Sequence, residues 1–325
     1  MNIVVTDWTF PNLSIEEDLL KSRGCHLIAR QCKTEAELVS LVAEADCVIT
    51  QFARISPTVI AAMGKSRGII RYGIGFDTVD LASAQGLGIP VCNVPDYCID
   101  EVADHTLAFI LSATRQVVTH TAHLRAGKWG LAVPLVEMQA LRDLVVGVVG
   151  FGRIGREVVR RLAAFKCRVV VFDPIAPAAE IARAGARPAG SLMEVLQESD
   201  VLTLHCPSTP ETRKLINEST LGKMKAGAVL INVARGDLVD TEALVRALGS
   251  GRLRTAALDV CDPEPIPDRH PLRSLQNVIL TPHIASVSPP AMKKLRESAA
   301  TLAAIAASGE LPPNVVNGVK VPRAL

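Results

Sequence analysis

The segment Leu144–Asp173 has the sequence LVVGVVGFGRIGREVVRRLAAFKCRVVVFD. An apolar run of strand length, Leu144–Val149, leads into a turn with three glycines and then into a stretch with helical periodicity. A second apolar run, Arg168–Phe172, ends at Asp173. The order of strand, glycine turn, helix, strand and carboxylate is that of a dinucleotide-binding βαβ unit.

Each glycine of this turn has its own expected role. Gly150 can make the sharp turn, Gly152 removes a side chain that would block a pyrophosphate, and Gly155 lets the helix pack close to the strand. The N–H groups at the helix start face the phosphate charge. The glycine pattern alone is equally typical of a structural loop, so the prediction depends on the flanking runs and on Asp173.

Asp173 indicates which dinucleotide would bind. It lies 23 residues after Gly150, near the spacing expected for an acid that binds the ribose. A carboxylate accepts a hydrogen bond from the ribose 2′-OH and repels a 2′-phosphate, and the next residue is Pro174 rather than an arginine. The sequence therefore favours NAD over NADP.

The composition limits the class of protein. A length of 325 residues suits two domains, and 49% apolar with 21% charged residues is typical of a folded chain. The net charge of +2 and the absence of a basic block argue against nucleic-acid binding. No apolar run reaches about 20 residues, so we expect no membrane span. Eight cysteines without a CxxC pair, and an N-terminus without a signal-peptide pattern, predict a reduced, cytoplasmic protein.

Short apolar runs alternate with amphipathic stretches on both sides of the glycine turn. This alternation predicts α/β architecture, with parallel sheets covered by helices on both faces. Residues 101–125 contain no proline or glycine and are expected to form one long helix, a spacer between domains. The strands expected before it are Ile3–Val5, His26–Ala29, Cys47–Thr50, Gly68–Arg71 and Pro90–Asn93.

The loop at residues 71–77, RYGIGFD, follows one of these strands. Ligands of parallel sheets bind at the carboxyl ends of strands, and two glycines there could expose backbone N–H groups to an anion. On spacing alone, a plain turn remains the more favoured interpretation.

Three polar residues follow late strands. Arg235 comes after LINVA, Glu264 after ALDVCDP and His283 after VILTP. An arginine fork fits a carboxylate, a histidine exchanges a proton near neutral pH, and a glutamate can hold the imidazolium. Together they suit the reduction of a carbonyl beside a carboxylate. Singly each could be structural, and His205, which also ends a strand, is a rival to His283.

No metal-ligand spacing is present, so we predict no metal site. The chain as a whole resembles the D-isomer-specific 2-hydroxyacid dehydrogenase family, which includes glyoxylate/hydroxypyruvate reductases, phosphoglycerate dehydrogenases and the C-terminal-binding-protein corepressors. The resemblance is carried by RYGIGFDTVD (71–80), NVPDYCIDEVADHTLAFIL (93–111), VVGVVGFGRIG (145–155), LINVARGDLVD (230–240), ALDVCDPEP (257–265) and NVILTPHIA (277–285).

The resemblance implies roles for individual residues. Arg235 would bind the substrate carboxylate and polarise the carbonyl, His283 would be the acid/base, and Glu264 would tune the histidine. Backbone N–H groups of Ile74 and Gly75 would hold the carboxylate. The residues implied at the cofactor, besides the three glycines, are Thr106, Arg153, Ile154, Asp173, Pro207, Ala234 and Asp259. Departures from the family pattern occur after His283, in PHIASVSPP, and before Glu264, in CDPEP.

The resemblance also implies an organisation into two doubly wound domains. A flavodoxin-like substrate domain would comprise residues 1–98 and 288–325, and a Rossmann NAD-binding domain residues 99–287. Family members commonly form homodimers through the cofactor domain. The implied function is NAD(H)-dependent interconversion of a small 2-oxo acid, such as glyoxylate or hydroxypyruvate, and the D-2-hydroxy acid.

Two alternatives remain. One is an NAD-responsive scaffold of the C-terminal-binding-protein kind, toward which the stretch at 93–109 leans. The other is a dehydrogenase of phosphite or of a phosphorylated hydroxy acid, for which Arg54 could bind a phosphate, although a surface arginine is the commoner interpretation.

Overall fold

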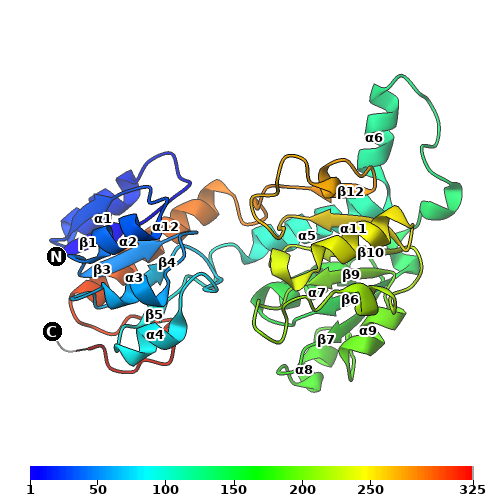
Figure 1. Cartoon of the computed structure of the whole chain (residues 1–325). Helices are drawn as coiled ribbons and strands as arrows, with labels where there is room; N and C mark the ends of the chain where they lie inside the picture. Colours follow the sequence, from blue (N-terminus) through cyan, green and yellow to red (C-terminus); the bar gives the residue numbers. More distant parts are fainter. Residues whose placement is uncertain (324–325) are drawn as a thin grey trace. The chain divides into compact units, whose positions relative to one another are not determined.

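The computed structural model of the chain describes residues 1–323, and these residues form two compact units. Met1–Tyr97 and the segment from Ser288 onward form the first unit, and Cys98–Val287 form the second. Both units contain a parallel β-sheet covered by helices on its two faces (Figure 1). The α/β fold class expected from the alternating pattern is confirmed.

The first unit is built on a five-stranded sheet of order β2-β1-β3-β4-β5, the flavodoxin-like order. Its strands are β1 (Asn2–Val5), β2 (His26–Ala29), β3 (Cys47–Thr50), β4 (Ile69–Arg71) and β5 (Val91–Cys92). Its helices are α1 (Ser14–Ser22), α2 (Glu35–Val42), α3 (Pro57–Ala61), α4 (Leu81–Gly86) and α12 (Pro289–Ala307).

The inner strands of this sheet are buried on both faces, which explains their continuous apolar runs. Ile3 and Val5 of β1 pack in a cluster with α1 and α12, whereas Val4 packs on the opposite face with residues of α2 and α3. Alanines of α12 let it approach the sheet closely: a Cβ on Gly68 would lie 2.6 Å from the Cβ of Ala306. The last long helix thus returns to complete the first unit.

The second unit is built on a seven-stranded sheet of order β12-β11-β10-β9-β6-β7-β8. The strands are β6 (Val145–Val149), β7 (Arg168–Phe172), β8 (Arg187–Pro188), β9 (Val201–Leu204), β10 (Ala228–Asn232), β11 (Leu253–Leu258) and β12 (Val278–Leu280). Strand order reverses between β6 and β9, which creates the switch point where dinucleotides bind in such sheets.

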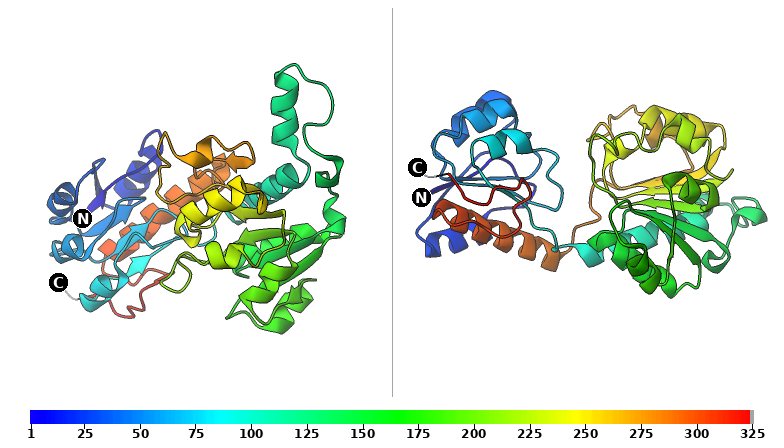
Figure 2. Two further views of the ribbon diagram at one scale, coloured as in Figure 1. Left: turned by 45° about the vertical axis from the view of Figure 1, so that its right-hand side comes forward. Right: turned by 90° about the horizontal axis from the view of Figure 1, so that it is seen from below.

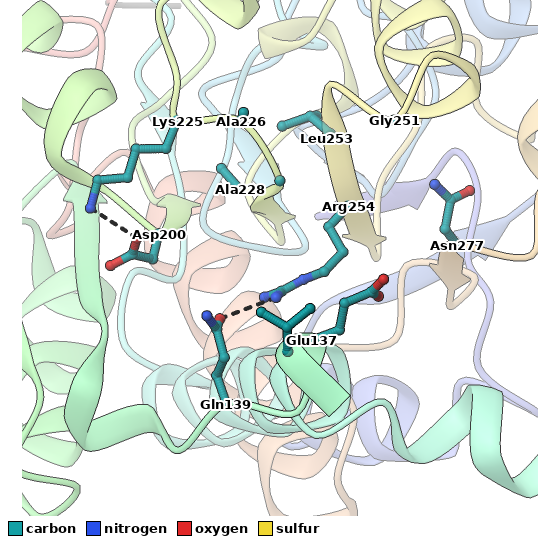
Figure 3. A pocket seen from close by; sticks show the side chains of 12 residues that line it. Glu137, Gln139, Asp200, Lys225, Ala226, Ala228, Gly251, Leu253, Arg254 and Asn277 are labelled. Carbon is teal, nitrogen blue, oxygen red and sulfur yellow. Dashed lines mark hydrogen bonds and ion pairs between the residues drawn. The ribbon is translucent and has the colours of Figure 1, made fainter. Parts of the chain in front are cut away.

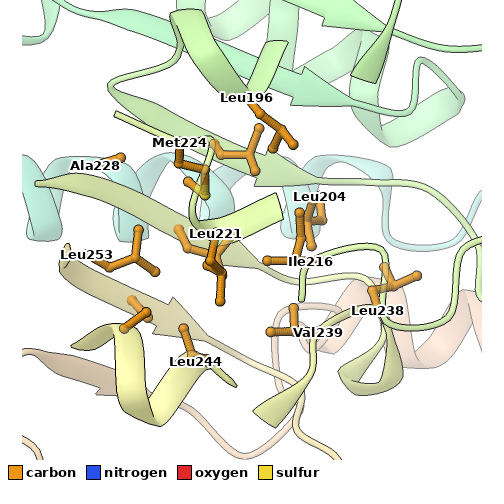
Figure 4. Packing of buried hydrophobic residues seen from close by; sticks show 14 of the residues in the cluster. Leu196, Leu204, Ile216, Leu221, Met224, Ala228, Leu238, Val239, Leu244 and Leu253 are labelled. Atoms are coloured by element: carbon orange, nitrogen blue, oxygen red, sulfur yellow. The ribbon is translucent and has the colours of Figure 1, made fainter. Parts of the chain in front are cut away.

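Helices and short 3-10 turns surround this sheet. They are α5 (Ile99–Thr114), α6 (Val117–Arg125), η1 (Leu135–Glu137), η2 (Leu141–Asp143), α7 (Arg153–Ala163), α8 (Ala178–Arg183), α9 (Leu192–Glu198), α10 (Glu218–Leu221), η3 (Gly236–Leu238), α11 (Thr241–Gly249) and η4 (Pro271–Arg273). α5 packs against α7, β10 and β11. Leucines of α9, α10 and α11 form a dry core with β9, β10 and β11 (Figure 4).

The prediction of a single helix over residues 101–125 is wrong. α5 ends at Thr114, Gln116 has left-handed backbone angles (φ 52°, ψ 34°), and α6 begins at Val117. A residue with left-handed backbone angles ends a helix. That residue is usually a glycine, which would have marked the break in the sequence, but here it is a glutamine. α5 buries eight side chains, while α6 buries none and, beyond its contact with α5, projects from its unit (Figures 1 and 2).

Among the described residues, no helix has both the length and the apolar character needed to cross a membrane.

Candidate active site

The glycine turn connects β6 to α7 at the switch point. Gly150 has a positive φ of 99°, and a Cβ there would lie 2.7 Å from the backbone N of Cys206. A Cβ on Gly155 would lie 2.1 Å from Gly150 O, whereas a Cβ on Gly152 would meet no atom within 4 Å. Two of the glycines therefore permit close packing, and the third keeps the space before α7 open.

Asp173 follows β7 beside this turn. Its Oδ2 accepts a hydrogen bond from Phe151 N (2.6 Å), and its Oδ1 accepts from Ile175 N (2.8 Å) and Ala176 N (2.9 Å). Burial raises the pKa of the Asp173 carboxyl, but the three backbone N–H groups outweigh it and hold that pKa below its usual value. Asp173 is thus an ionised acceptor that also braces the turn.

These residues fit a dinucleotide. Arg153 and Ile154 occupy the first two positions of α7, whose N–H groups lack helical partners, and Gly152 precedes them without a side chain. The ionised Asp173, at the end of the neighbouring strand, would be the acceptor for a ribose hydroxyl. An anionic pyrophosphate and a ribose find complementary groups here.

Arg235 lies in the turn between β10 and η3, and Asn232 holds that turn. The Nδ2 of Asn232 donates to Arg235 O (2.7 Å), and its Oδ1 accepts from Ala234 N (3.1 Å). The Nη1 of Arg235 donates to Ala234 O (2.8 Å). The guanidinium is thereby kept at the carboxyl edge of the sheet.

Gly236 brings the arginine turn against the segment that leads to Glu264. A Cβ on Gly236 would lie 1.9 Å from Cys261 O, closer than any side chain permits. Because the two segments touch, the charge of Arg235 contributes to the electrostatics of Glu264. The sequence predicted Arg235, but it gave no reason to single out Gly236.

Glu264 and His283 form a direct pair, with His283 Nδ1 lying 2.6 Å from Glu264 Oε1. Burial raises the pKa of Glu264, but the hydrogen bond from His283, a backbone hydrogen bond from Cys261 and the charge of Arg235 outweigh it and lower that pKa. Glu264 is therefore a carboxylate at neutral pH. It holds the proton on Nδ1, so Nε2 is the ring nitrogen that would exchange a proton with a reactant.

The backbone of the His283 segment is held by Asp259, which is 2% exposed at the end of β11. Asp259 Oδ1 accepts from Ile284 N (2.9 Å), Oδ2 accepts from Ala285 N (2.8 Å), and Asp259 O accepts from His283 N (2.8 Å). His283 itself has a left-handed φ of 55°. Asp259 thus shapes the loop that carries His283, a role that its place in the sequence did not reveal.

His205, the rival histidine, lacks the properties of an acid catalyst. Burial lowers its pKa to about 3, so the imidazole is neutral across the physiological range. Its Nε2 lies 2.9 Å from Thr203 Oγ1, and its backbone packs against the glycine turn. The neighbouring thiol of Cys206 is uncharged too, because burial raises its pKa to about 11.

The remaining predicted cofactor residues occupy different settings. Thr106 on α5 is fully buried, and its hydroxyl donates to Val102 O (2.7 Å). Pro207 is exposed after β9, and its carbonyl accepts from Thr212 Oγ1 (2.7 Å). Ala234 is half-buried beside Arg235. Contact of these residues with a cofactor stays a prediction.

Ile74 and Gly75 lie in the first unit, in the loop after β4. Asn93 Nδ2 donates to Ile74 O (2.6 Å), and Val94 N donates to Gly73 O (3.0 Å), so the loop is anchored at the end of the sheet. Within residues 1–323, neither Ile74 N nor Gly75 N has a protein acceptor. These two adjacent N–H groups could donate to an anion, and their binding of the substrate carboxylate stays a prediction.

A hollow of about 470 Å³ lies at the opposite, amino edge of the second unit's sheet (Figure 3). There Lys225 pairs with Asp200 (2.8 Å), and Arg254 Nη1 donates to Gln139 Oε1 (3.1 Å). None of the predicted site residues lines this hollow. Among the described residues, no three His, Cys, Asp or Glu side chains gather as metal ligands.

Residues 107–285 match the family model described as D-isomer specific 2-hydroxyacid dehydrogenase, NAD binding domain. The chain is 36% identical over 310 residues to a glyoxylate reductase of Thermofilum pendens, covering 90% of this chain and 88% of the relative. A D-3-phosphoglycerate dehydrogenase of Mycobacterium leprae is 37% identical over 282 residues, which cover 86% of this chain but 53% of that relative.

A solved structure of D-lactate dehydrogenase from Aquifex aeolicus, complexed with NAD and lactic acid, has a TM-score of 0.87 and 28% identity. The match covers 95% of this chain and 96% of that one. The chain described here belongs to the D-isomer-specific 2-hydroxyacid dehydrogenase family. It is an NAD-dependent oxidoreductase that acts on 2-hydroxy acids, as the sequence predicted.

Proposed function

We propose that the protein reduces a small 2-oxo acid, such as glyoxylate or hydroxypyruvate, to the D-2-hydroxy acid with NADH. Arg235, Glu264 and His283 would be the catalytic residues. The observation that carries this proposal is the direct His283–Glu264 pair, with the charge of Arg235 beside it at the carboxyl edge of the sheet. An acid, its orienting carboxylate and an anion-binding fork are what the reduction of a 2-oxo acid requires.

In this mechanism, the nicotinamide supplies a hydride when it is bound. His283 gives the proton on Nε2 to the carbonyl oxygen of the substrate, while Glu264 holds Nδ1 and stabilises the imidazolium. Arg235 binds the substrate carboxylate with its fork and stabilises the oxygen as negative charge develops on it. In the oxidation direction, His283 takes the proton back.

The proposed cofactor site consists of the glycine turn, Arg153, Ile154, Asp173, Thr106, Pro207, Ala234 and Asp259. Gly150, Gly152 and Gly155 shape the pyrophosphate site, and the acceptor-free N–H groups of Ile74 and Gly75 would bind the substrate carboxylate. Residues 1–98 with 288–325 would then form the substrate domain, and residues 99–287 the NAD-binding domain.

The proposal of a small substrate without a phosphate draws on the glyoxylate reductase relative, which is 36% identical to this chain over 310 residues. Arg54, the candidate phosphate ligand, has an exposed side chain. Arg71, which lies in the same region, donates to Tyr72 O and packs over the Phe52 ring (5.8 Å), so its guanidinium supports the loop.

The test is a panel of 2-oxo acids with NADH and with NADPH: glyoxylate, hydroxypyruvate, pyruvate, phosphohydroxypyruvate and bulkier acids. We expect the highest kcat/KM with NADH and glyoxylate or hydroxypyruvate. A preference for phosphohydroxypyruvate would replace the proposed substrate class. NADH binding without turnover of any acid would favour the scaffold function instead.

We also propose that the protein is a homodimer that uses α6 and the segment after it. Apolar side chains there are exposed without a partner in the unit: Val117, Val118, Leu124, Trp129, Leu131, Leu135 and Val136. A second copy would cover them, since exposed apolar patches usually mark interfaces. Light scattering should give a dimer for the wild type and a monomer for Trp129→Asp with Leu135→Asp. A monomeric wild type would contradict this.

We place the protein in the cytoplasm, because all eight cysteines are free thiols, as a reducing compartment would keep them. Cell fractionation of a tagged chain tests this location.

A further inference from the structure

His105 has no role in the site as described so far, yet its side chain reaches the network behind His283. It lies on α5, its side chain is 20% exposed, and its ring packs edge-on against Phe109 with 4.4 Å between centroids. His105 Nε2 is 3.1 Å from Thr281 Oγ1 and 3.9 Å from Asp259 Oδ1. Although far from it in the sequence, His105 thus contacts Thr281, two residues before His283, and comes near Asp259, which binds the His283 segment.

The hydrogen-bond directions in this network are determined by the acceptors. Thr281 Oγ1 lies 2.5 Å from Asp259 Oδ1, and a carboxylate oxygen only accepts, so Thr281 donates its single proton to Asp259. The Thr281 oxygen can then only accept from His105, which must carry a proton on Nε2. The order of donation is His105 to Thr281 to Asp259.

Asp259 in turn holds the backbone at the proposed acid, His283, and at the two residues after it. Its two carboxylate oxygens accept the N–H groups of Ile284 and Ala285, and its carbonyl accepts the N–H of His283. His283 has a φ of 55°, a conformation that few non-glycine residues adopt and that contacts such as these stabilise. The orientation of the His283 ring therefore depends on the orientation of the Asp259 carboxylate.

We propose that His105 is a positioning residue for the reaction: through Thr281 it orients the Asp259 carboxylate, which holds the backbone of His283 in its left-handed conformation. This inference depends on the proposed role of His283 as the acid. Without the His105 N–H, the Thr281 hydroxyl loses the hydrogen bond that it accepts. The Asp259 carboxylate, in a residue only 2% exposed, is then less firmly oriented. The role as a packing residue beside Phe109 is the competing explanation.

Two substitutions separate positioning from packing. Glutamine carries an N–H group at about the reach of Nε2, whereas leucine keeps apolar volume beside Phe109 without a donor. We expect His105→Leu to lower kcat about tenfold or more, since displacements near 1 Å at a reacting group can cost up to about 10²-fold. KM for NADH should change less than twofold, and His105→Gln should recover most of the rate.

A double-mutant cycle gives a second measurement. Thr281→Val removes the middle of the same path, so the variant that combines it with His105→Leu should be no slower than Thr281→Val alone. Additive losses would overturn the proposal, and so would a wild-type kcat in His105→Leu or equal losses in the Leu and Gln variants. If His105→Leu does not fold, Thr281→Val and His105→Gln still decide it.

Magnetic resonance of the full chain with isotope-labelled histidine gives a readout apart from activity. It should show His105 protonated on Nε2 in the wild type and lose that state in Thr281→Val; a proton on Nδ1 alone would overturn the proposal. His283→Asn, assayed in parallel, separates the role of His283 from that of His105. If that variant keeps its rate, His283 is not the acid. If it loses its rate while His105→Leu does not, only the positioning role of His105 is wrong.

Discussion

The glycine turn after β6 and the loop around His283 lie at the same edge of one sheet, but their conformations have different origins. In the turn, Gly150 adopts a positive φ that glycine permits locally, and Gly155 leaves out a side chain that would meet Gly150 O. In the loop, His283 adopts a left-handed φ of 55° without being a glycine. The turn is encoded by its own residues, whereas the loop is imposed by contacts from β11 and β12.

This difference predicts which step of the reaction a substitution in each region would affect. Changes within the turn should act on cofactor binding, because the residues that shape it also line the proposed pyrophosphate site. Changes around the loop should act on the chemical step, because residues such as Asp259 support His283 from behind.

The largest effect is expected for His283→Asn. Asparagine tolerates left-handed backbone angles, so this change removes the acid without adding strain. We expect kcat to fall by roughly 10²–10⁴, the usual contribution of a general acid. Steady-state reduction assays measure it, with His26→Ala on the exposed side of β2 as the control. A near-normal kcat would remove His283 from the mechanism.

Arg235→Lys should come next. Lysine keeps the charge but loses the planar fork that binds a carboxylate through two hydrogen bonds. We expect kcat/KM for the 2-oxo acid to fall about 10²-fold or more, as for the loss of an oxyanion donor. KM for NADH should change little. An unchanged kcat/KM would mean that the substrate carboxylate binds elsewhere.

A matched pair of glycine changes tests the comparison directly. The new Cβ of Gly155→Ala would lie 2.1 Å from Gly150 O, and that of Gly236→Ala 1.9 Å from Cys261 O. The first should raise KM for NADH, and the second should lower kcat, by up to about 10²-fold if the shift is near 1 Å. Gly249→Ala, whose Cβ meets nothing within 4 Å, is the control. The comparison fails if both variants change the same kinetic constant.

The smallest effect is expected for Glu264→Gln. The loss of a carboxylate that stabilises the imidazolium should move the alkaline limit of reduction to lower pH, with a rate loss on the order of tenfold at pH 8. A pH profile of kcat/KM measures this, and a shift to higher pH would contradict the assigned role.

The lowered pKa of Glu264 also has a stability consequence. A carboxyl whose pKa falls on folding stabilises the protein above its unfolded-state pKa, and that contribution is lost as pH falls through the lowered value. The Tm difference between wild type and Glu264→Gln should therefore be present at neutral pH and disappear in acid. A difference that persisted in strong acid would show that the glutamine perturbs packing instead.

Much of the fold could be predicted from local patterns. Strands buried on both faces have continuous apolar sequences. β6 and β10 are such strands, and both lie where the apolar runs predicted them. The break between α5 and α6 could not be predicted, because Gln116 is left-handed without a glycine to mark it. Nothing in the periodicity of that stretch distinguishes one helix from two.

The sequence by itself determined the glycine turn, the candidate ribose acid Asp173 and the candidates Arg235, Glu264 and His283, because residue type and position after a strand carry that information. Only the tertiary structure decided that His283 and Glu264 are paired, that His205 stays neutral, and that Asp259, Thr281 and His105 support the His283 loop. The reason is physical. A glycine changes the conformations open to its own backbone, but a hydrogen bond between residues 105 and 281 exists only after a helix and a strand have packed together.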